Sequence, residues 1–354
     1  MSNWNNIYVV LKNFLKKDIL MQIGAFFFFA GMTFLVASNE IHIAYVSASF
    51  SSVLDIKQSS VWGESFLGIM LLLTGSLLFI IRAGLYLRTV NNSVAALFFF
   101  VGMKSQNDSP PEYALLPEDR IGLDRLVHKV NSYIPQNVLD EYQFWAKTIS
   151  ERVSHSEASK GYVAALGSIP SLYAIGTLFR NGHLPLFFLE HNRSIDRWHP
   201  LDEIGSYKKL NVVFNEYCNN SALENVRANS NGDIGVAISF TNQVLENELP
   251  ESLRGHTLFL ELDNVDKKYD ALPVESNQIE IAKKISHIIS VLNKKENVKR
   301  THLFICAQST FVVNLGRLYQ DNMTGEVVIH NYDSIDKNYP WALSFDRDLK
   351  RYKS

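Results

Sequence analysis

The chain has 354 residues, of which 47% are hydrophobic and 20% charged, and its formal net charge is −2. This length has room for two or three domains, and the lack of net positive charge argues against binding of long nucleic acid. The two distant cysteines, Cys218 and Cys306, suit a reducing compartment without disulfides, and the ten histidines form no HxxxH or HExxH pattern, so no metal site is predicted.

Two apolar segments near the N-terminus predict membrane-spanning helices. Residues 19–37 carry no formal charge, and residues 65–87 form a second span when the side chain of Arg82 reaches the headgroups. A helix rises about 1.5 Å per residue, so both segments approach the roughly 30 Å of the hydrocarbon core. The alternatives are a buried hairpin of a soluble protein and a cleaved signal peptide, although Leu35 occupies the −3 position of the nearest Ala-ending cleavage site. We therefore expect residues 1–90 to form a two-helix transmembrane hairpin.

Flanking charges predict the direction of this hairpin. Three lysines precede the first span, and Arg82 and Arg88 end or follow the second. The loop between the spans has three acidic residues and a single lysine. Because positive residues are retained in the cytoplasm, both termini are predicted to lie there, which makes the protein a multi-pass inner-membrane protein. The alternating residues 41–50 (IHIAYVSASF) predict a short extracytoplasmic β-hairpin.

The membrane region is followed by segments typical of a soluble domain. Residues 94–103 (VAALFFFVGM) are too few to span a bilayer as a helix and predict a buried strand. If they did span, the C-terminal part would lie outside the cell. Residues 104–121 contain three prolines and predict a loop. Residues 123–153 have helical spacing and predict two helices separated at Pro135.

Short apolar runs then alternate with helical ones, which predicts an α/β domain with a mainly parallel sheet. The expected strands are Tyr162–Leu166, Leu186–Leu189, Ile234–Phe240, Thr257–Leu262, His302–Cys306 and Val327–Ile329. The expected helices are Ser171–Phe179, Asn277–Leu292 and Val312–Tyr319.

An internal repeat lies within this domain. Residues 167–200 and 307–340 superpose without a gap when the sequence is shifted by 140 positions. The identities include Gly176 with Gly316, and the Ser-Ile-Asp triplets that begin at Ser194 and Ser334. A duplication of this kind predicts two Rossmann-like halves, about 94–265 and 266–354, packed as a pseudo-dimer in one chain.

Candidate ligand-binding residues follow the predicted strands, because ligands of such sheets bind beyond the carboxyl ends of the strands, where helix N-termini present free N–H groups. One loop contains Gly167, Ser168 and Ser171. The equivalent loop of the second half contains Gln308, Ser309 and Thr310. The alternative is simple N-capping of the two helices. Neither loop is a GxGxxG or P-loop sequence, so neither a dinucleotide cofactor nor ATP hydrolysis is expected.

Further candidates lie on later loops. Arg193 is a candidate phosphate clamp, and Trp198 and Tyr332 are candidates for stacking on bases, unless they are a surface charge and core aromatics. Ser239 and Thr241 follow another strand. No GxSxG, Cys–His or paired-carboxylate motif is found, so the chain is not expected to be an enzyme.

The repeated segments resemble the SAVED domain of bacterial CBASS anti-phage systems. The resemblance rests on ALGSIPSLYAIGTLFRNGHLPLFFLEHNRSIDRW from Ala165 and on HLFICAQSTFVVNLGRLYQDNMTGEVVIHNYDSIDKNYPWAL from His302. The segment from Phe98, FFFVGMKSQNDSPPEYALLPEDR, is similar to the opening strand and loop of the family. The resemblance covers roughly residues 94–350 and implies a cytoplasmic α/β domain made of two fused CARF-like Rossmann-type units.

The resemblance also implies a function. SAVED domains bind cyclic oligonucleotides made by a partner nucleotidyltransferase of the CD-NTase type, and binding promotes oligomerisation that activates an effector. With a two-helix hairpin as the effector, the chain resembles a two-transmembrane SAVED protein that binds a cyclic di- or trinucleotide, self-associates and disrupts the bilayer, leading to abortive infection. No other cofactor is expected. The alternatives are a membrane-tethered phosphodiesterase that degrades the same ligand, and an anchored receptor that relays to another protein.

Overall fold

The computed structural model describes most of the chain beyond residue 93 and parts of the chain before it. The described residues are 27, 41–47, 50–56, 69–78, 80–81, 94–102, 109–120, 122–129, 131–155, 158–180, 184–263, 270–320, 325–346 and 348–352. The chain forms two compact units. One contains Met1–Ser93 with Pro117–Gly122, and the other contains Val94–Leu116 with Leu123–Ser354.

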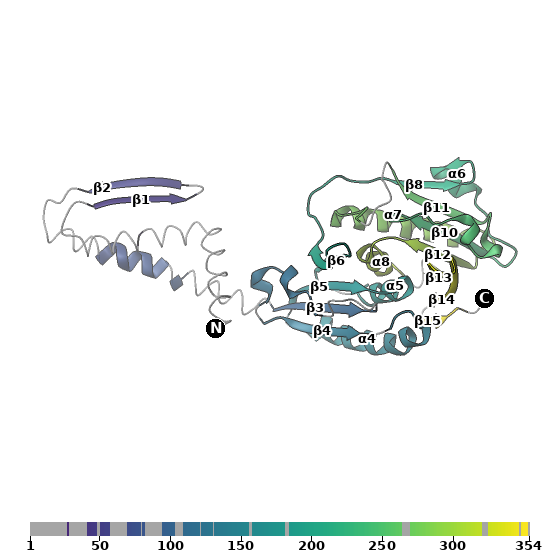
Figure 1. Cartoon of the computed structure of the whole chain (residues 1–354), viewed down its shortest axis with the longest axis horizontal. Helices are drawn as coiled ribbons and strands as arrows, with labels where there is room; N and C mark the ends of the chain where they lie inside the picture. The colour runs from purple at the N-terminus through teal and green to yellow at the C-terminus, as the bar shows by residue number, and fades with distance from the viewer. Residues whose placement is uncertain are drawn as a thin grey trace. The chain divides into compact units, whose positions relative to one another are not determined.

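The N-terminal unit contains the β-hairpin that the alternating sequence predicted. Strands β1 (Ile41–Ser47) and β2 (Phe50–Ile56) pair antiparallel over their whole lengths (Figure 1). Helical residues 69–78 and 80–81 fall inside the second predicted span. The first predicted span, residues 19–37, lies outside the described residues except for Phe27, which is helical. Among the residues that the structure describes, no helix is long and apolar enough to cross a bilayer.

The larger unit begins with a five-stranded sheet of order β4-β3-β5-β6-β7. Its first four strands in that order are parallel, and β7 closes an antiparallel hairpin with β6. The central strand β3 is apolar on both faces, as expected for a parallel strand covered on both sides. The strands are β3 (Val94–Val101), β4 (Asp124–Lys129), β5 (Ala158–Leu166), β6 (Leu186–Asn192) and β7 (Arg197–Pro200).

An eight-stranded sheet of order β15-β14-β13-β12-β10-β11-β8-β9 follows. Its central strands β13, β12, β10 and β11 are parallel, and the outer strands are antiparallel, so the prediction of mainly parallel pairing is confirmed for the centre of both sheets. The strands are β8 (Leu210–Phe214), β9 (Tyr217–Cys218), β10 (Asp233–Ser239), β11 (Thr257–Leu262), β12 (Arg300–Cys306), β13 (Glu326–Asp333), β14 (Asn338–Asp346) and β15 (Asp348–Arg351).

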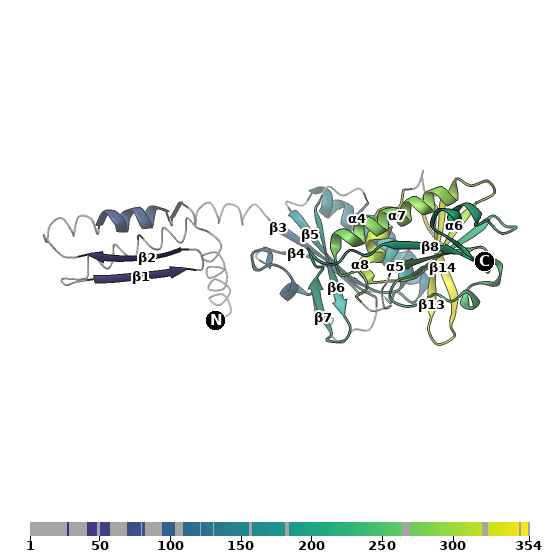
Figure 2. The same cartoon turned by 90° about the horizontal axis from the view of Figure 1, so that it is seen from above.

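The helices of this unit lie between and beside the sheets. Figures 1 and 2 show α5 and α8 between the two sheets. The inner faces of both sheets and these two helices share one continuous hydrophobic core, to which β3, β5, β10 and β12 contribute. The helices are α4 (Pro135–His155), α5 (Ile169–Leu178), α6 (Asn219–Asn225), α7 (Glu275–Asn293) and α8 (Ser309–Arg317), with short 3-10 turns at Glu112–Ala114, Glu246–Glu248 and Glu251–Leu253. A further 3-10 turn, Pro117–Arg120, belongs to the N-terminal unit.

Two sequence-based predictions are wrong. The segment from residue 123 does not begin with a helix, because Asp124–Lys129 pairs with β3 as strand β4 and its spacing of apolar residues only imitates a helical pattern. Pro135 instead begins α4, where its missing N–H costs no helical hydrogen bond. The boundary between the halves is not near residue 265, since β10 and β11 pair with β12 in the second sheet, so the sheets divide between β7 and β8.

The duplication extends beyond the repeat found in the sequence. The order strand, strand, helix, strand, helix, strand, strand occurs first in β3–β4–α4–β5–α5–β6–β7 and again in β10–β11–α7–β12–α8–β13–β14. In both sheets the first and third strands of this series are neighbours and pair parallel. The two halves are therefore copies of one unit, and residues 201–232, with β8, β9 and α6, are inserted between them.

The register of the repeat changes along the chain. Val163 pairs with Phe188, and Leu303, which lies 140 positions after Val163, pairs with Ile329, which lies 141 positions after Phe188. Equivalent residues of β6 and β13, and of the turns that follow them, are thus 141 apart. The Ser-Ile-Asp triplets beginning at Ser194 and Ser334 are out of structural register by one residue, so their identity does not support the duplication.

The closest approach of the halves is the crossing of α5 and α8. A Cβ atom added to Gly176 would overlap the carbonyl oxygen of Val313, and one added to Gly316 would overlap that of Tyr173. Tyr173 and Val313 are themselves 140 positions apart, so an approximate two-fold axis repeats the same contact. Only glycine at both positions permits this backbone approach, which explains the Gly176–Gly316 identity in the repeat.

Gly176→Ala tests the crossing. The added methyl group forces the two helix backbones apart, so we expect the free energy of unfolding of the full-length protein to fall by about 1–3 kcal/mol. Denaturant unfolding followed by tryptophan fluorescence measures this change. The matched control is Lys147→Ala on the exposed face of α4, with an expected change within about 0.5 kcal/mol. Equal effects of the two substitutions would show that the helices do not cross at Gly176.

A buried polar chain crosses the outer face of the second sheet. Arg300 Nε lies 2.7 Å from Asp233 Oδ1, and His302 Nε2 lies 3.5 Å from the same oxygen. His302 Nδ1 is 2.9 Å from Nε2 of His330, whose ring stacks on Phe304. Burial lowers the pKa of His330 well below its ordinary value, and His302 lowers it further. The pKa of Asp233 is lowered to about 2: burial raises it, but the hydrogen bonds from His302 and Arg300 outweigh burial.

These shifts predict acid sensitivity in two separate pH ranges. Below pH about 6.5 the unfolded chain protonates His330 and the folded protein does not, so the free energy of unfolding falls from pH 7 to pH 5. The contribution of Asp233 is lost only below about pH 4. His330→Phe should flatten the first range and leave the second, as measured by denaturant unfolding at each pH. His287→Gln, on the exposed face of α7, is the control. An unchanged slope between pH 7 and 5 in His330→Phe would contradict the assignment.

Candidate functional site

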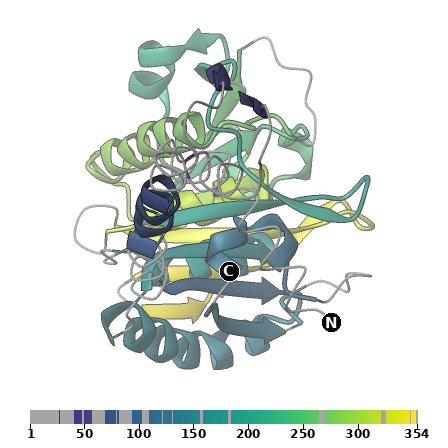
Figure 3. The ribbon, with the colours of Figure 1, turned by 90° about the vertical axis from the view of Figure 1, so that its left-hand side faces the viewer.

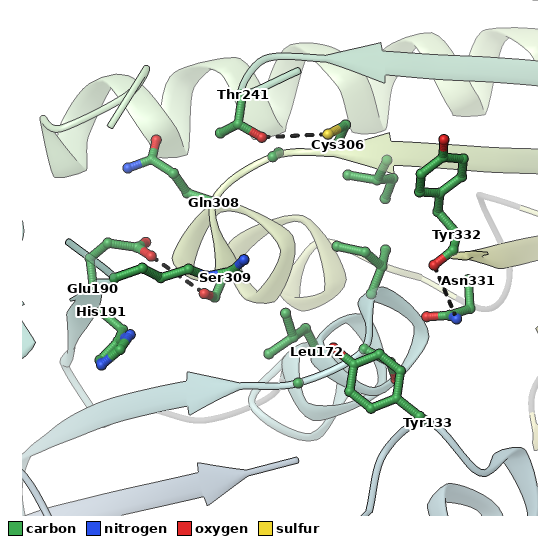
Figure 4. Close-up of a pocket in the computed structure, with 16 residues that line it drawn as sticks. Tyr133, Leu172, Glu190, His191, Thr241, Cys306, Gln308, Ser309, Asn331 and Tyr332 are labelled. Atoms are coloured by element: carbon green, nitrogen blue, oxygen red, sulfur yellow. Dashed lines mark hydrogen bonds between the residues drawn. The ribbon is translucent and has the colours of Figure 1, made fainter. Parts of the chain in front are cut away.

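A cavity of about 260 Å³ lies where α5 and α8 begin, at the carboxyl ends of β5, β6, β12 and β13 (Figure 4). Both halves contribute to its wall. The predicted residues that line it are Gly167, Ser168, Arg193, Thr241, Gln308, Ser309 and Tyr332. The two loops that the sequence placed on separate halves therefore open into one shared cavity, as the pseudo-dimer arrangement requires.

The four other predicted residues do not line the cavity. Ser171 is buried and its hydroxyl donates to the carbonyl of Ser168. Trp198 is buried on the outer face of the first sheet, where its ring contacts His191. Ser239 Oγ accepts a hydrogen bond from the N–H of Val244 and shapes the turn after β10. The hydroxyl of Thr310 donates a hydrogen bond to the carboxylate of Glu190. These four residues were predicted to bind the ligand, but the geometry of their strands and helices keeps their side chains out of the cavity lining.

The start of α5 is held by Ser132, from the segment between β4 and α4. Ser168 N–H donates to Ser132 Oγ at 2.8 Å, and Ser168 Oγ donates to the Ser132 carbonyl at 2.6 Å. Ser132 Oγ in turn donates to the carbonyl of Gly102. Ser168 therefore does not cap its helix with its side chain, and neither does Gln308 at the start of α8. The N-capping alternative is excluded for both residues.

The start of α8 is held by residues from both halves. Gln308 Oε1 accepts a hydrogen bond from the N–H of Leu272 at 2.7 Å. Glu190, at the end of β6 in the other half, accepts from Ser309 Oγ and from the Thr310 N–H, each at 3.3 Å, and from the Thr310 hydroxyl. Burial raises the pKa of Glu190, while the hydrogen bonds from Thr310 oppose that change. One carboxylate thus links the two halves at the cavity wall.

Aromatic side chains form the opposite side of the cavity. Figure 4 shows Tyr133 and Tyr332 on one side and Glu190 with Gln308 on the other. Tyr133 is 44% exposed, and its pKa is raised by burial of its hydroxyl and lowered by the nearby charge of Arg193. Burial also raises the pKa of Tyr332. Two tyrosines and an arginine close together provide stacking surfaces and a positive charge for an anionic aromatic ligand.

Sequence reasoning missed several lining residues, of which Glu190 and Tyr133 matter most for the chemistry. Glu190 is the only charged residue of the run LFFLE and lies near the end of a buried strand. A charged residue at such a position could have been noticed as a candidate in the sequence. Tyr133 lies in a segment predicted to be helical, so nothing pointed to it. Cys306 also lines the cavity, with its sulfur 3.5 Å from Thr241 Oγ1. Among the described residues, no group of three or more His, Cys, Asp or Glu side chains could hold a metal ion.

This domain was compared with known protein families, curated proteins and solved structures. A search of curated proteins finds no match. The solved structure of an Acinetobacter baumannii Cap4 SAVED/CARF-domain containing receptor with the cyclic trinucleotide 3′3′3′-cAAA matches at 13% identity and a TM-score of 0.46, covering 78% of this chain and 59% of that chain. The Moraxella osloensis Cap4 SAVED/CARF-domain containing receptor matches at 14% identity and a TM-score of 0.39, with the same coverage. The matched region thus spans 59% of the length of these receptors.

The family assignment rests on the sequence rather than on these structural scores. The family described as "SMODS-associated and fused to various effectors sensor domain" matches residues 142–345, more than half of the chain. The matched range begins in α4 and ends in β14, so it contains α5, α8 and every lining residue of the shared cavity except Tyr133. The chain belongs to the SAVED family of sensor domains.

Proposed function

We propose that this protein is a membrane effector of CBASS anti-phage defence whose SAVED domain binds a cyclic oligonucleotide, in the first place a cyclic trinucleotide, in the cavity between its halves. The observation that carries the proposal is the joint construction of the cavity by two duplicated units, with two helix starts, an arginine and two tyrosines among its lining. Membership of a sensor-domain family supports the same conclusion. A partner nucleotidyltransferase of the CD-NTase type would supply the ligand.

The geometry suggests how such a ligand is held. Phosphates bind Arg193 and the first-turn N–H groups of α5, which have no intrahelical partners; Pro170 contributes none. Bases stack on Tyr133 and Tyr332. At about 260 Å³ the cavity is near the lower limit for small-molecule sites, so part of a cyclic trinucleotide lies outside it. The β6–β7 and β13–β14 hairpins extend to the same side of the domain in Figures 2 and 3 and flank that outer part.

We propose a receptor role without turnover of the ligand. The polar groups at the helix starts are engaged with the protein itself: Ser168 with Ser132, and Ser309 with Glu190. A hydroxyl held in this way is poorly placed to attack or activate a phosphodiester. The phosphodiesterase alternative therefore gains no support from the cavity.

The membrane part of the proposal rests on the sequence. Residues 19–37 and 65–87 have the length and apolar character of two spans, with positive flanks that keep the SAVED domain cytoplasmic at the inner membrane. Ligand-induced self-association of the domains would concentrate their hairpins. Weak helix packing then becomes productive because the local concentration rises, and the crowded hairpins disrupt the bilayer. The resulting leakage would end the infection together with the cell.

Arg193→Gln tests the binding site. Loss of one charged hydrogen bond to phosphate is expected to weaken binding of cyclic triadenylate about 10- to 100-fold. Isothermal titration of the full-length protein in detergent measures this, and chromatography of the recovered ligand should show it intact. Arg180→Gln, just beyond the other end of α5, is the matched control and should bind like the wild type. Equal affinity of both variants would place the ligand elsewhere, and linear products would favour the phosphodiesterase.

Dye release from liposomes tests the effector. Liposomes containing the full-length protein should release entrapped dye several-fold faster when cyclic triadenylate is added on the side of the SAVED domain. The Arg193→Gln protein should need a correspondingly higher ligand concentration. Equal release with and without ligand would refute ligand-gated disruption. Ligand binding without any release would favour the anchored receptor that relays to another protein.

A further inference from the structure

Among the differences between the two halves inside the cavity, one concerns a buried charged residue. In the register of 141, the equivalent of Glu190 is Asn331, which is also buried at the cavity wall. Where α8 begins with Ser309 and Thr310, α5 begins with Ile169 and Pro170, which have no side-chain donor, and Pro170 has no N–H. The carboxylate contact at α8 therefore has no counterpart at α5, although the backbone of the two sites is related by the approximate two-fold axis.

Glu190 changes what the start of α8 can bind. A helix N-terminus ordinarily attracts anions, but here a carboxylate occupies it and repels a second negative charge. Glu190 Oε2 accepts from both the N–H and the hydroxyl of Thr310, which uses both of its lone pairs. Within the part of the chain that the structure describes, Glu190 Oε1 accepts only from Ser309 Oγ, which leaves room for one further donor.

The side-chain amide of Gln308 provides a hydrogen-bond donor on the same side of the cavity as Glu190. The carbonyl oxygen of Gln308 is held by the N–H of Leu272, so its NH₂ group is left as the donor. Figure 4 shows Gln308 and Glu190 on the same side of the cavity. One acceptor and one donor on the same side of the cavity are suited to the edge of a nucleobase and poorly suited to a phosphate, which has only acceptors.

We propose that Glu190 is a specificity-determining residue that makes the α8 end of the cavity a nucleobase subsite, where its carboxylate accepts a hydrogen bond from an exocyclic amino group. Phosphates are confined to the α5 end beside Arg193. This proposal rests on the proposed function. A base held in one orientation by its phosphates must present an amino group here, because a carbonyl oxygen at the same place would face the carboxylate.

Cyclic triadenylate and its analogue with three unsubstituted purines (nebularine nucleotides) provide the test, because the change removes only the 6-amino group of adenine and leaves N1 an acceptor. Full-length wild-type protein should bind the adenine ligand about tenfold or more tightly, as expected for one buried base contact. Glu190→Gln should reduce that preference to below about threefold, because a neutral amide accepts a hydrogen bond from the amino group more weakly than a carboxylate does. It should also strengthen binding of inorganic pyrophosphate, because the repelling charge is gone. Isothermal titration measures all three ligands.

Asn331→Asp is the matched control at the equivalent position. It adds a carboxylate at the α5 side and should weaken binding of both cyclic ligands by a similar factor without changing their ratio. Thermal unfolding checks that each variant is folded. If Glu190→Gln does not fold, the preference of the wild type decides, and a wild type that binds both ligands equally overturns the proposal.

The outcomes distinguish failure of the proposed function from failure of the role proposed for Glu190. A wild-type protein that binds neither cyclic ligand refutes the proposed function itself. A wild type that prefers adenine, with the same preference retained in folded Glu190→Gln, leaves the proposed function intact and overturns the role of Glu190.

Discussion

The crossing of α5 and α8 at Gly176 and Gly316 is the constraint on which the rest of the domain depends. Because neither residue has a side chain, the two helices meet backbone to backbone between the sheets. This contact makes the two inner sheet faces parts of one hydrophobic core. It also brings the starts of both helices to the same cavity, so a packing requirement in the middle of the helices determines where a ligand can bind.

Much of this fold could be predicted from apolar runs. Strands such as β10 (Asp233–Ser239) are buried on both faces and stand out in the sequence, and the buried strand at residues 94–103 is confirmed as β3. Strand β4 could not be recognised, because its sequence DRLVHK has charged residues at both ends and the strand depends on pairing with β3. The boundary between the halves was also beyond local patterns, since only pairing shows that β10 belongs with β12. The two membrane spans remain a prediction.

The candidate site was partly predictable for a related reason. Residues directly after strands, such as Ser168 and Gln308, reach the cavity because parallel strands end at a common edge. Residues farther from the strand ends depend on side-chain direction, and Trp198 is turned to the outer face. The contacts of Glu190 could be identified only from the structure, because its partners Ser309 and Thr310 lie about 120 positions away in the chain. The cavity is thus defined by contacts between halves that no local pattern contains.

The order of the two halves along the chain has a consequence for synthesis. The first sheet is complete at Pro200, whereas α8, which covers the inner face of α5, ends at Arg317. A ribosome adds about 5–20 residues per second, so the apolar face of α5 waits roughly 6–25 seconds for its partner helix. During that interval the nascent first half exposes a surface suited to sticking to other chains. We therefore expect the unfinished chain to be more prone to aggregation than the completed domain.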